Sequence, residues 1–278
     1  MNILLTQLAK WRICTSERIG QSPIFVRSPS SSLLLTVSLP KMTFAKYLTE
    51  FIGTFFLVFV ICLMTTQGND HTGIVAPIAI GCTLMIMVFM GGHVSGGHYN
   101  PAVTLACFLR GACSWADVVP YWISQVAGAC AAAFLSTIVL IPGEEALSVC
   151  ANVGPGTGHT LTSIGPWVVE ILFTFALALV VLNTATSSGT KGNSFYGLAI
   201  GFTVVVAAFA GGGISGGAFN PAVGIGTNVI RGTIGESPEA FARFPLYIAG
   251  PMIGGALAAV VFKFQEAWVD HAAKLEAK

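Results

Sequence analysis

The sequence predicts an all-α membrane protein in which six transmembrane helices and two re-entrant half-helices form an inverted repeat. The first observation is the composition, because 54% of the 278 residues are hydrophobic and only 9% are charged, whereas soluble domains carry about 25% charged residues. The mean hydropathy is +0.78. The second observation is an internal duplication, and the third is a series of long apolar segments. Together they exclude a soluble globular domain.

One sequence segment occurs twice in the chain, with substitutions. The segment His93–Val103 returns as Gly213–Val223, at an offset of 120 residues. The same offset relates Glu50 to Glu170. The chain therefore consists of two copies of one membrane unit, and the repeated phrase marks the centre of each copy.

Six segments are long and apolar enough to span a bilayer, which requires about 20 mainly apolar residues. They lie at about 44–65, 74–92, 119–141, 166–184, 195–212 and 243–265. The two repeats cover about 43–141 and 163–265, within a membrane domain at 42–266. Because each repeat contributes an odd number of spans, the second repeat must be inverted relative to the first.

Basic residues near the spans predict the orientation in the membrane. Four of them fall on one side of the predicted spans, namely Lys41, Lys46, Arg110 and Lys191. The loops at 66–73 and 142–165 contain no Lys or Arg. Since positively charged loops remain in the cytoplasm, we expect cytoplasmic N- and C-termini, with 267–278 as a C-terminal tail. Arg231 and Arg243, in the last long loop, favour the opposite orientation.

Residues 1–41 differ from the rest of the chain. They are Ser-rich and basic, and Glu17 is their only acid. The apolar run Leu33–Leu39 is too short to span a membrane. We expect a disordered extension, either a transit-like targeting segment or an upstream mis-start with Met42 as the true initiator, and we assign it no function.

Each copy of Asn-Pro-Ala follows a Gly-rich stretch and precedes a short apolar run. Asn is a good helix N-cap and Pro is favoured in the first helical turn, so we predict a half-helix capped by Asn100 and another capped by Asn220. In inverted repeats the two N-termini meet near the midplane, and each carries about +0.5 elementary charge. A cation meets two like-signed dipoles there, whereas a neutral molecule does not.

The other polar groups of these loops suit a pore. Each Asn side-chain amide can donate a hydrogen bond to a passing oxygen. The extended residues before the caps can offer carbonyl oxygens, and these residues are Gly96, Gly97, His98, Gly216, Gly217 and Ala218. Irregular backbone at membrane depth is tolerated where it lines a wet cavity. The pattern predicts a pore for small neutral solutes that form hydrogen bonds.

With two motifs in register within a duplicated frame, Asn100-Pro101-Ala102 and Asn220-Pro221-Ala222, the chain resembles the aquaporins, the major intrinsic protein family. The resemblance covers about 43–265 and implies a homotetramer in the lipid bilayer. An acid within a span is costly and by default functional. Glu50 and Glu170 resemble family positions that anchor the re-entrant loops; the alternative is an interfacial Glu near a helix end.

In the family, selectivity lies at an outer constriction of four positions. Counting from the motifs assigns these positions to Ile80, Ala208, Gly217 and Val223. Water-selective members resemble a set with an aromatic residue, a His, a small residue and an Arg, of which this chain has only the small residue. Val223 is the largest departure, because an Arg would bring donors and a fixed charge, and the set resembles that of plant vacuolar members. The narrowest point is then expected near the motifs, bordered by Leu57, Leu84, Leu177 and Val204.

Two further positions bear on the solute. Glycerol-conducting members of the family carry Arg-Asp after the second motif, whereas this chain has Val223-Gly224, which argues against a standard glycerol facilitator. Before the last span, Tyr247-Ile248 matches only half of the aromatic pair that favours the water subgroup.

We therefore expect a passive channel for water and other small neutral solutes, namely ammonia, urea, hydrogen peroxide or glycerol, that excludes protons and ions. The alternatives are a solute facilitator with little water selectivity and a low-flux structural or adhesion protein of the same fold. No nucleophile–base pair or metal-ligand cluster occurs, so we expect neither an enzyme nor a cofactor nor a metal. The net charge of +1 gives no nucleic-acid footprint. The seven cysteines have no C-x-x-C spacing, and we interpret them as packing thiols.

Overall fold

The computed structural model describes residues 25–27, 34–36, 43–65, 72–140, 154–234 and 237–276. The chain divides into two units, residues 1–46 and residues 47–278. In the first unit, strands β1 (Phe25–Arg27) and β2 (Leu34–Thr36) pair antiparallel with Val26 opposite Leu35. This hairpin within the N-terminal extension was not predicted from the sequence.

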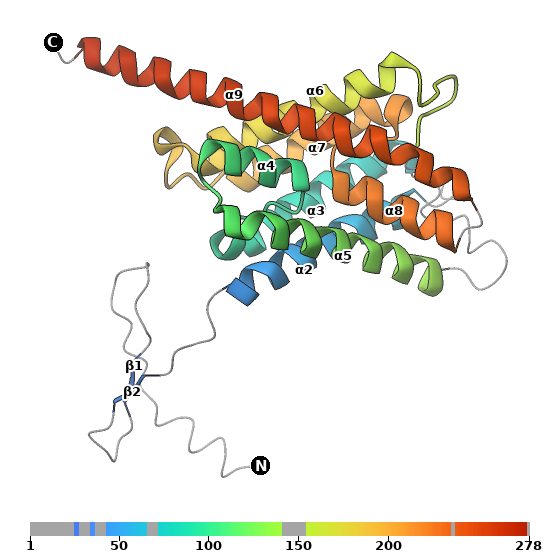
Figure 1. The fold of residues 1–278 in the computed structure, drawn as a ribbon, viewed down its shortest axis with the longest axis horizontal. Helices are drawn as coiled ribbons and strands as arrows, with labels where there is room; N and C mark the ends of the chain where they lie inside the picture. Colours follow the sequence, from blue (N-terminus) through green and yellow to red (C-terminus); the bar gives the residue numbers. More distant parts are fainter. Residues whose placement is uncertain are drawn as a thin grey trace. The chain divides into compact units, whose positions relative to one another are not determined.

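The fold consists mainly of long α-helices (Figure 1). They are α2 (Thr43–Met64), α3 (Thr72–Ser95), α5 (Trp115–Leu140), α6 (Ile164–Val181), α7 (Tyr196–Ser215) and α9 (Phe244–Glu276). In the described part of the chain, six helices are long and apolar enough to cross a membrane. The predicted fold class is therefore confirmed.

Two helices are too short to span a bilayer. Helix α4 (Pro101–Arg110) has 10 residues and α8 (Pro221–Thr233) has 13, which corresponds to roughly 15 and 20 Å at 1.5 Å per residue. Helix α4 ends at Gly111, whose φ of 92° is left-handed and directs its N–H to the carbonyl of Phe108. After this termination the chain continues into α5.

Short irregular elements join the long helices. Helix α6 continues into η2 (Leu182–Thr186), a π-helical turn, which is followed by η3 (Ser188–Thr190). The 3₁₀ helix η4 (Pro238–Arg243) leads into α9. Helix α9 extends 11 residues beyond the predicted span end at residue 265, because its last turns contain helix-forming residues and neither Gly nor Pro.

Glycines permit close crossings between helices, both between the two repeats and within each repeat. Helix α3 packs on α7, and a Cβ placed on Gly201 would lie 2.5 Å from the carbonyl oxygen of Gly81, with the reciprocal distance also 2.5 Å. Gly128 of α5 faces the backbone of Phe51 as Gly254 of α9 faces that of Ile171. Small residues at such crossings allow backbones to approach in membranes.

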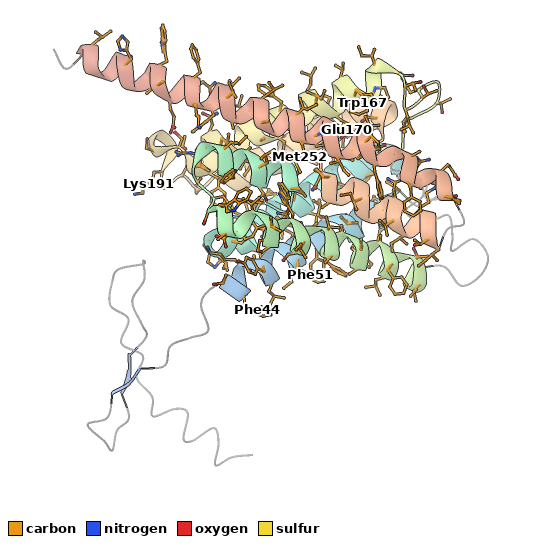
Figure 2. The ribbon with its side chains drawn as sticks, viewed as in Figure 1. Phe44, Phe51, Trp167, Glu170, Lys191 and Met252 are labelled. Atoms are coloured by element: carbon orange, nitrogen blue, oxygen red, sulfur yellow. The ribbon has the colours of Figure 1, made fainter. Side chains whose placement is uncertain are left out.

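Polar and apolar groups are distributed as expected for a membrane protein. Large apolar side chains such as Ile123, Val206 and Val260 are exposed, where lipid can cover them. Fully buried polar residues include Glu50 and Gln125, and Figure 2 marks Glu170 on α6. The interior therefore combines a mainly apolar core with a smaller number of buried polar side chains.

The interpretation of all cysteines as packing thiols was wrong for Cys62, which is disulfide-bonded. Scattered spacing in the sequence gives no indication of such pairing, because a disulfide depends on distance in the fold. Cys82, Cys107 and Cys130 are free thiols.

Candidate functional site

The two Asn-Pro-Ala motifs begin the two half-helices. Asn100 has extended backbone angles (φ −156°, ψ 120°), and its side-chain oxygen accepts a hydrogen bond of 2.9 Å from the N–H of Ala102. Asn220 does the same for Ala222, also at 2.9 Å. Pro occupies the first helical turn in both cases. Each Asn therefore caps the positive end of its half-helix.

The two caps are tied to each other reciprocally. The side-chain amide nitrogen of Asn100 donates to the carbonyl of Phe219 at 2.9 Å, and that of Asn220 donates to the carbonyl of Tyr99 at 2.9 Å. The N-termini of α4 and α8 consequently meet. Each amide uses one N–H for this link, which leaves its second N–H for a solute.

Tyr99 and Phe219 were missed by the sequence analysis. Both have a left-handed backbone, with φ of 49° and 46°, a conformation that costs about 1–3 kcal/mol in a residue with a side chain. It turns each carbonyl towards the opposite Asn, while each N–H points back to a glutamate. Their place in the repeat was the available signal, because both are aromatic and immediately precede the cap.

The two buried glutamates accept hydrogen bonds from the loops that precede the two caps. The carboxylate of Glu50 accepts hydrogen bonds from four donors: the Ser95 hydroxyl at 2.6 Å, the N–H of His98 at 3.0 Å, the N–H of Tyr99 at 2.7 Å and Gln125 Nε2 at 2.8 Å. Glu170 accepts from three: the Ser215 hydroxyl at 2.7 Å, the N–H of Ala218 at 3.0 Å and the N–H of Phe219 at 2.7 Å. Both glutamates are fully buried.

The third span of each repeat supplies further supports that the sequence analysis missed. The hydroxyl of Tyr121 donates to the Ser95 carbonyl at 2.7 Å, and that of Tyr247 donates to the Ser215 carbonyl. These tyrosines are 126 rather than 120 residues apart, so the offset found in the motifs does not reveal them. At the same offset Gln125 corresponds to a proline, which explains why Glu170 lacks a fourth donor.

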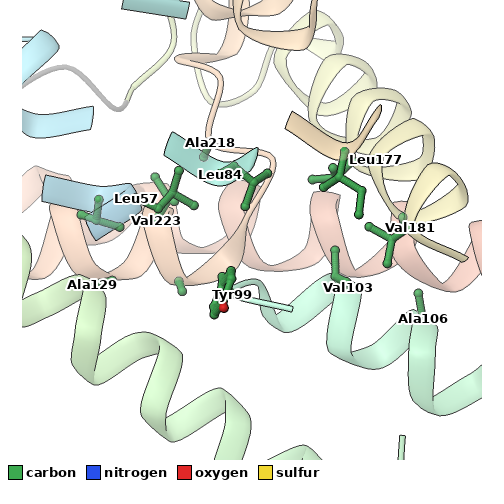
Figure 3. Close-up of a cluster of buried hydrophobic side chains, with 14 of the residues drawn as sticks. Leu57, Leu84, Tyr99, Val103, Ala106, Ala129, Leu177, Val181, Ala218 and Val223 are labelled. Atoms are coloured by element: carbon green, nitrogen blue, oxygen red, sulfur yellow. The ribbon is translucent and has the colours of Figure 1, made fainter. Parts of the chain in front are cut away.

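A cavity of about 320 Å³ surrounds the two caps. Its lining includes Asn100 and Asn220 and all eight residues predicted for the constriction and the pore wall: Ile80, Ala208, Gly217, Val223, Leu57, Leu84, Leu177 and Val204. Figure 3 shows Leu57, Leu84 and Leu177 in a cluster of buried side chains that also contains Val223. The sequence positions chosen by counting thus come together around one space.

Some predicted residues do not reach this cavity. Of the six residues predicted to offer carbonyl oxygens, five line the cavity and Gly96 does not. The Pro and Ala of both motifs are buried behind the Asn residues, and Ala102 and Ala222 are both 0% exposed. In the described part of the chain, no hydrogen bond uses the carbonyls of Gly97, His98, Gly217 or Ala218.

The cavity wall carries no formal charge, since none of its described lining residues is Asp, Glu, Lys or Arg. Its polar side chains include both caps and His98, whose Nδ1 lies 3.1 Å from the Thr104 hydroxyl. Among the described residues, no group of three or more His, Cys, Asp or Glu side chains is placed to hold a metal ion. The arrangement can therefore bind and orient a neutral hydrogen-bonding molecule.

Comparisons with known proteins agree on the family. Residues 37–262 match the Major intrinsic protein family. The chain is 34% identical over 231 residues to Aquaporin NIP2-2 of Zea mays, covering 80% of this chain and 72% of that protein. It is 31% identical over 231 residues to the Glycerol uptake facilitator protein of Streptococcus pneumoniae, covering 77% of this chain and 96% of that protein.

A solved structure shares the fold. The aquaglyceroporin from Plasmodium falciparum superimposes with a TM-score of 0.62 at 20% identity, covering 79% of this chain and 93% of that chain. The chain therefore belongs to the Major intrinsic protein family, and it is an integral multi-pass membrane protein of the aquaporin and aquaglyceroporin type, a channel for water and small solutes and not an enzyme.

Proposed function

We propose that this channel conducts water together with ammonia, urea, hydrogen peroxide and glycerol, and that it excludes protons and ions. The observation that carries the proposal is the uncharged cavity around the two linked caps. A solute there meets amide donors from Asn100 and Asn220 and carbonyl acceptors before each cap. Such a wall can replace part of the hydration of a neutral molecule.

The half-helices supply the barrier to cations. Each N-terminus contributes about +0.5 elementary charge, and the two ends meet at the caps. No acidic side chain of the described lining compensates this positive potential. A hydronium or metal cation would lose water at that point without gaining a counter-charge, whereas a neutral solute would not encounter this barrier.

The outer constriction is formed in this proposal by Ile80, Ala208, Gly217 and Val223. All four line the cavity and none can donate a side-chain hydrogen bond. A solute at this point therefore meets no polar side-chain contact. This supports passage of small solutes besides water, while Val223-Gly224 in place of Arg-Asp separates the chain from a standard glycerol facilitator.

The assembly and orientation complete the proposal. We place both termini in the cytoplasm, on the charge pattern of the loops, and assign residues 42–266 to the channel and 267–278 to a cytoplasmic tail. Glu50 and Glu170 act as loop anchors. The exposed apolar sides of the bundle provide contact surfaces for lipid and for the other subunits of a homotetramer.

Stopped-flow light scattering on proteoliposomes tests the function. In an impermeant osmolyte, protein-containing vesicles should shrink faster than empty vesicles, which reports water flux. In a separate experiment with a gradient of urea or glycerol, they should re-swell faster than empty vesicles, which reports solute flux. A pH-sensitive dye inside the same vesicles should report no added proton leak. Solute flux without water flux would favour a facilitator with little water selectivity. If neither the water flux nor the solute flux exceeds that of empty vesicles, a structural or adhesion role is favoured.

A further inference from the structure

The cavity is symmetric around the caps but not at its two ends. Nine pairs of residues separated by 120 positions line it, for example Leu57 with Leu177 and Val103 with Val223. The repeat mates of the other lining residues do not line the cavity. These unmatched lining residues all lie at the end where α2 ends and α3 begins, and they are Thr65, Ala76, Pro77, Ala208, Phe209, Gly212, Gly213 and Gly216. The cavity thus reaches further towards this end, called outer here, than towards the opposite, inner end.

The repeat defines an inner counterpart of the outer constriction. The outer ring consists of Ile80, Ala208, Gly217 and Val223, and the positions 120 residues away form the inner ring of Ile200, Val88, Gly97 and Val103. The two rings therefore differ at one place only. Ala208 lines the cavity, whereas its mate Val88 is 2% exposed and does not.

Two neighbouring positions also carry larger side chains on the inner side than on the outer side. His98 lines the cavity beside the inner ring where the outer end has Ala218, and its imidazole is held at 3.1 Å from Thr104. Tyr196 stands at the position that corresponds to Ala76, and its ring packs edge-to-face on Phe89 at 5.2 Å. At each of these places, the inner side chain is larger than its outer mate.

From this asymmetry we infer that the inner ring, and not the outer one, limits solute size, and that Val88 is the residue that sets the limit. The inference rests on the proposed conduction of neutral solutes. Interiors are close-packed, so the extra methyl groups of Val88 occupy space that Ala208 leaves open at the outer ring. The solutes sorted by this ring are uncharged molecules of the size of urea and glycerol.

Two reciprocal substitutions test the inference. Val88→Ala gives the inner ring the composition of the outer one, and we expect the ratio of glycerol to water permeability in proteoliposomes to rise on the order of tenfold, the effect that small apolar changes have on discrimination. Ala208→Val gives the outer ring the composition of the inner one and should leave the ratio unchanged. The double exchange moves the narrow ring outward and should restore the parental ratio. Val118→Ala, a 1% exposed valine of α5 outside the cavity lining, is the matched control.

The opposite pattern overturns the inference. If Ala208→Val lowers the ratio while Val88→Ala leaves it unchanged, the outer ring sets the limit. Should Val88→Ala fail to fold, Ala208→Val and the double exchange still decide, because a limiting inner ring predicts an unchanged ratio in both. Failure of the proposed function is distinct from this result, since the parent protein would then conduct neither water nor solute.

Discussion

The two buried glutamates act through the backbone N–H groups that converge on them. In Glu50→Gln or Glu170→Gln, an amide N–H must face at least one of these donors, and a buried donor without an acceptor costs about 1–3 kcal/mol. We expect each variant to lower both the thermal stability in detergent and the water flux. Glu266→Gln is the control, because that side chain is partly exposed, forms an ion pair with Arg110 and contacts neither loop, and Gln keeps an oxygen that can accept from Arg110. Normal flux in both test variants would contradict the anchoring role.

The missing cation at the outer ring gives a second residue-scale prediction. In Val223→Arg, a long charged side chain enters a cavity wall that has none, so the outer ring should replace the inner one as the narrowest point. We expect glycerol and urea permeability to fall on the order of tenfold relative to water. Val223→Met is the control that separates the effect of side-chain size from the effect of charge, because Met is longer than Val but has no hydrogen-bond donor. A solute-to-water ratio equal to that of the parent would show that residue 223 does not lie at a constriction.

At this scale, repeat mates at 120 positions revealed residue identities but not backbone conformations. Glu50, Glu170 and both caps were predicted because each has an identical residue 120 positions away. Tyr99 and Phe219 were missed because a left-handed backbone is decided by the tertiary hydrogen bonds on both sides of the residue. Gln125 was missed because its place in the second repeat is taken by Pro251, so no duplication marks it.

Helix boundaries were predicted well where the sequence marks them with a capping residue or a proline, and poorly where it does not. Pro101 and Pro221 fixed the starts of both half-helices, as the N-cap pattern predicts. The end of α9 was predicted too early because hydropathy falls there while helix propensity does not. The third spans are offset by 126 residues, because α8 and the segment between α8 and α9 are longer than α4 and the segment between α4 and α5. No sequence pattern predicted the π-helical turn η2.

The close crossing of α3 and α7 should be needed for the stability of the fold. In Gly201→Ala, the added Cβ would meet the backbone carbonyl of Gly81 at 2.5 Å, and neither backbone can move without separating the helices. We expect a clear loss of folded protein in detergent. Gly212→Ala in the same helix is the matched control, because a Cβ there has no atom within 4 Å and Ala favours helix over Gly by about 1 kcal/mol. Equal stability of the two variants would show that the close crossing does not support the fold.

The molecule as a whole is a pair of repeats whose odd number of spans forces opposite orientations. This inversion brings the positive ends of α4 and α8 together, which neither repeat could do alone. The fold class and family could be predicted from the sequence because the duplication and the hydropathy are both linear signals. The asymmetry of the cavity could not, because it depends on which lining residues the packing leaves open to the central space.

Inversion makes a prediction about sidedness that two insertion sites can test. Gly158 precedes α6 and Gly192 follows it, both are exposed, and a Cβ at either position would have no atom within 4 Å, so a short epitope after either glycine should not disturb packing. In cells whose surface carries the protein, we expect the epitope at Gly158 to be labelled from outside. The epitope at Gly192, next to Lys191, and one at the C-terminus should be labelled only after permeabilisation. Labelling of Gly158 and Gly192 from the same side would mean that α6 does not cross, and the inverted repeat would be wrong. Complete reversal of both patterns would preserve the repeat and overturn only the orientation derived from charge.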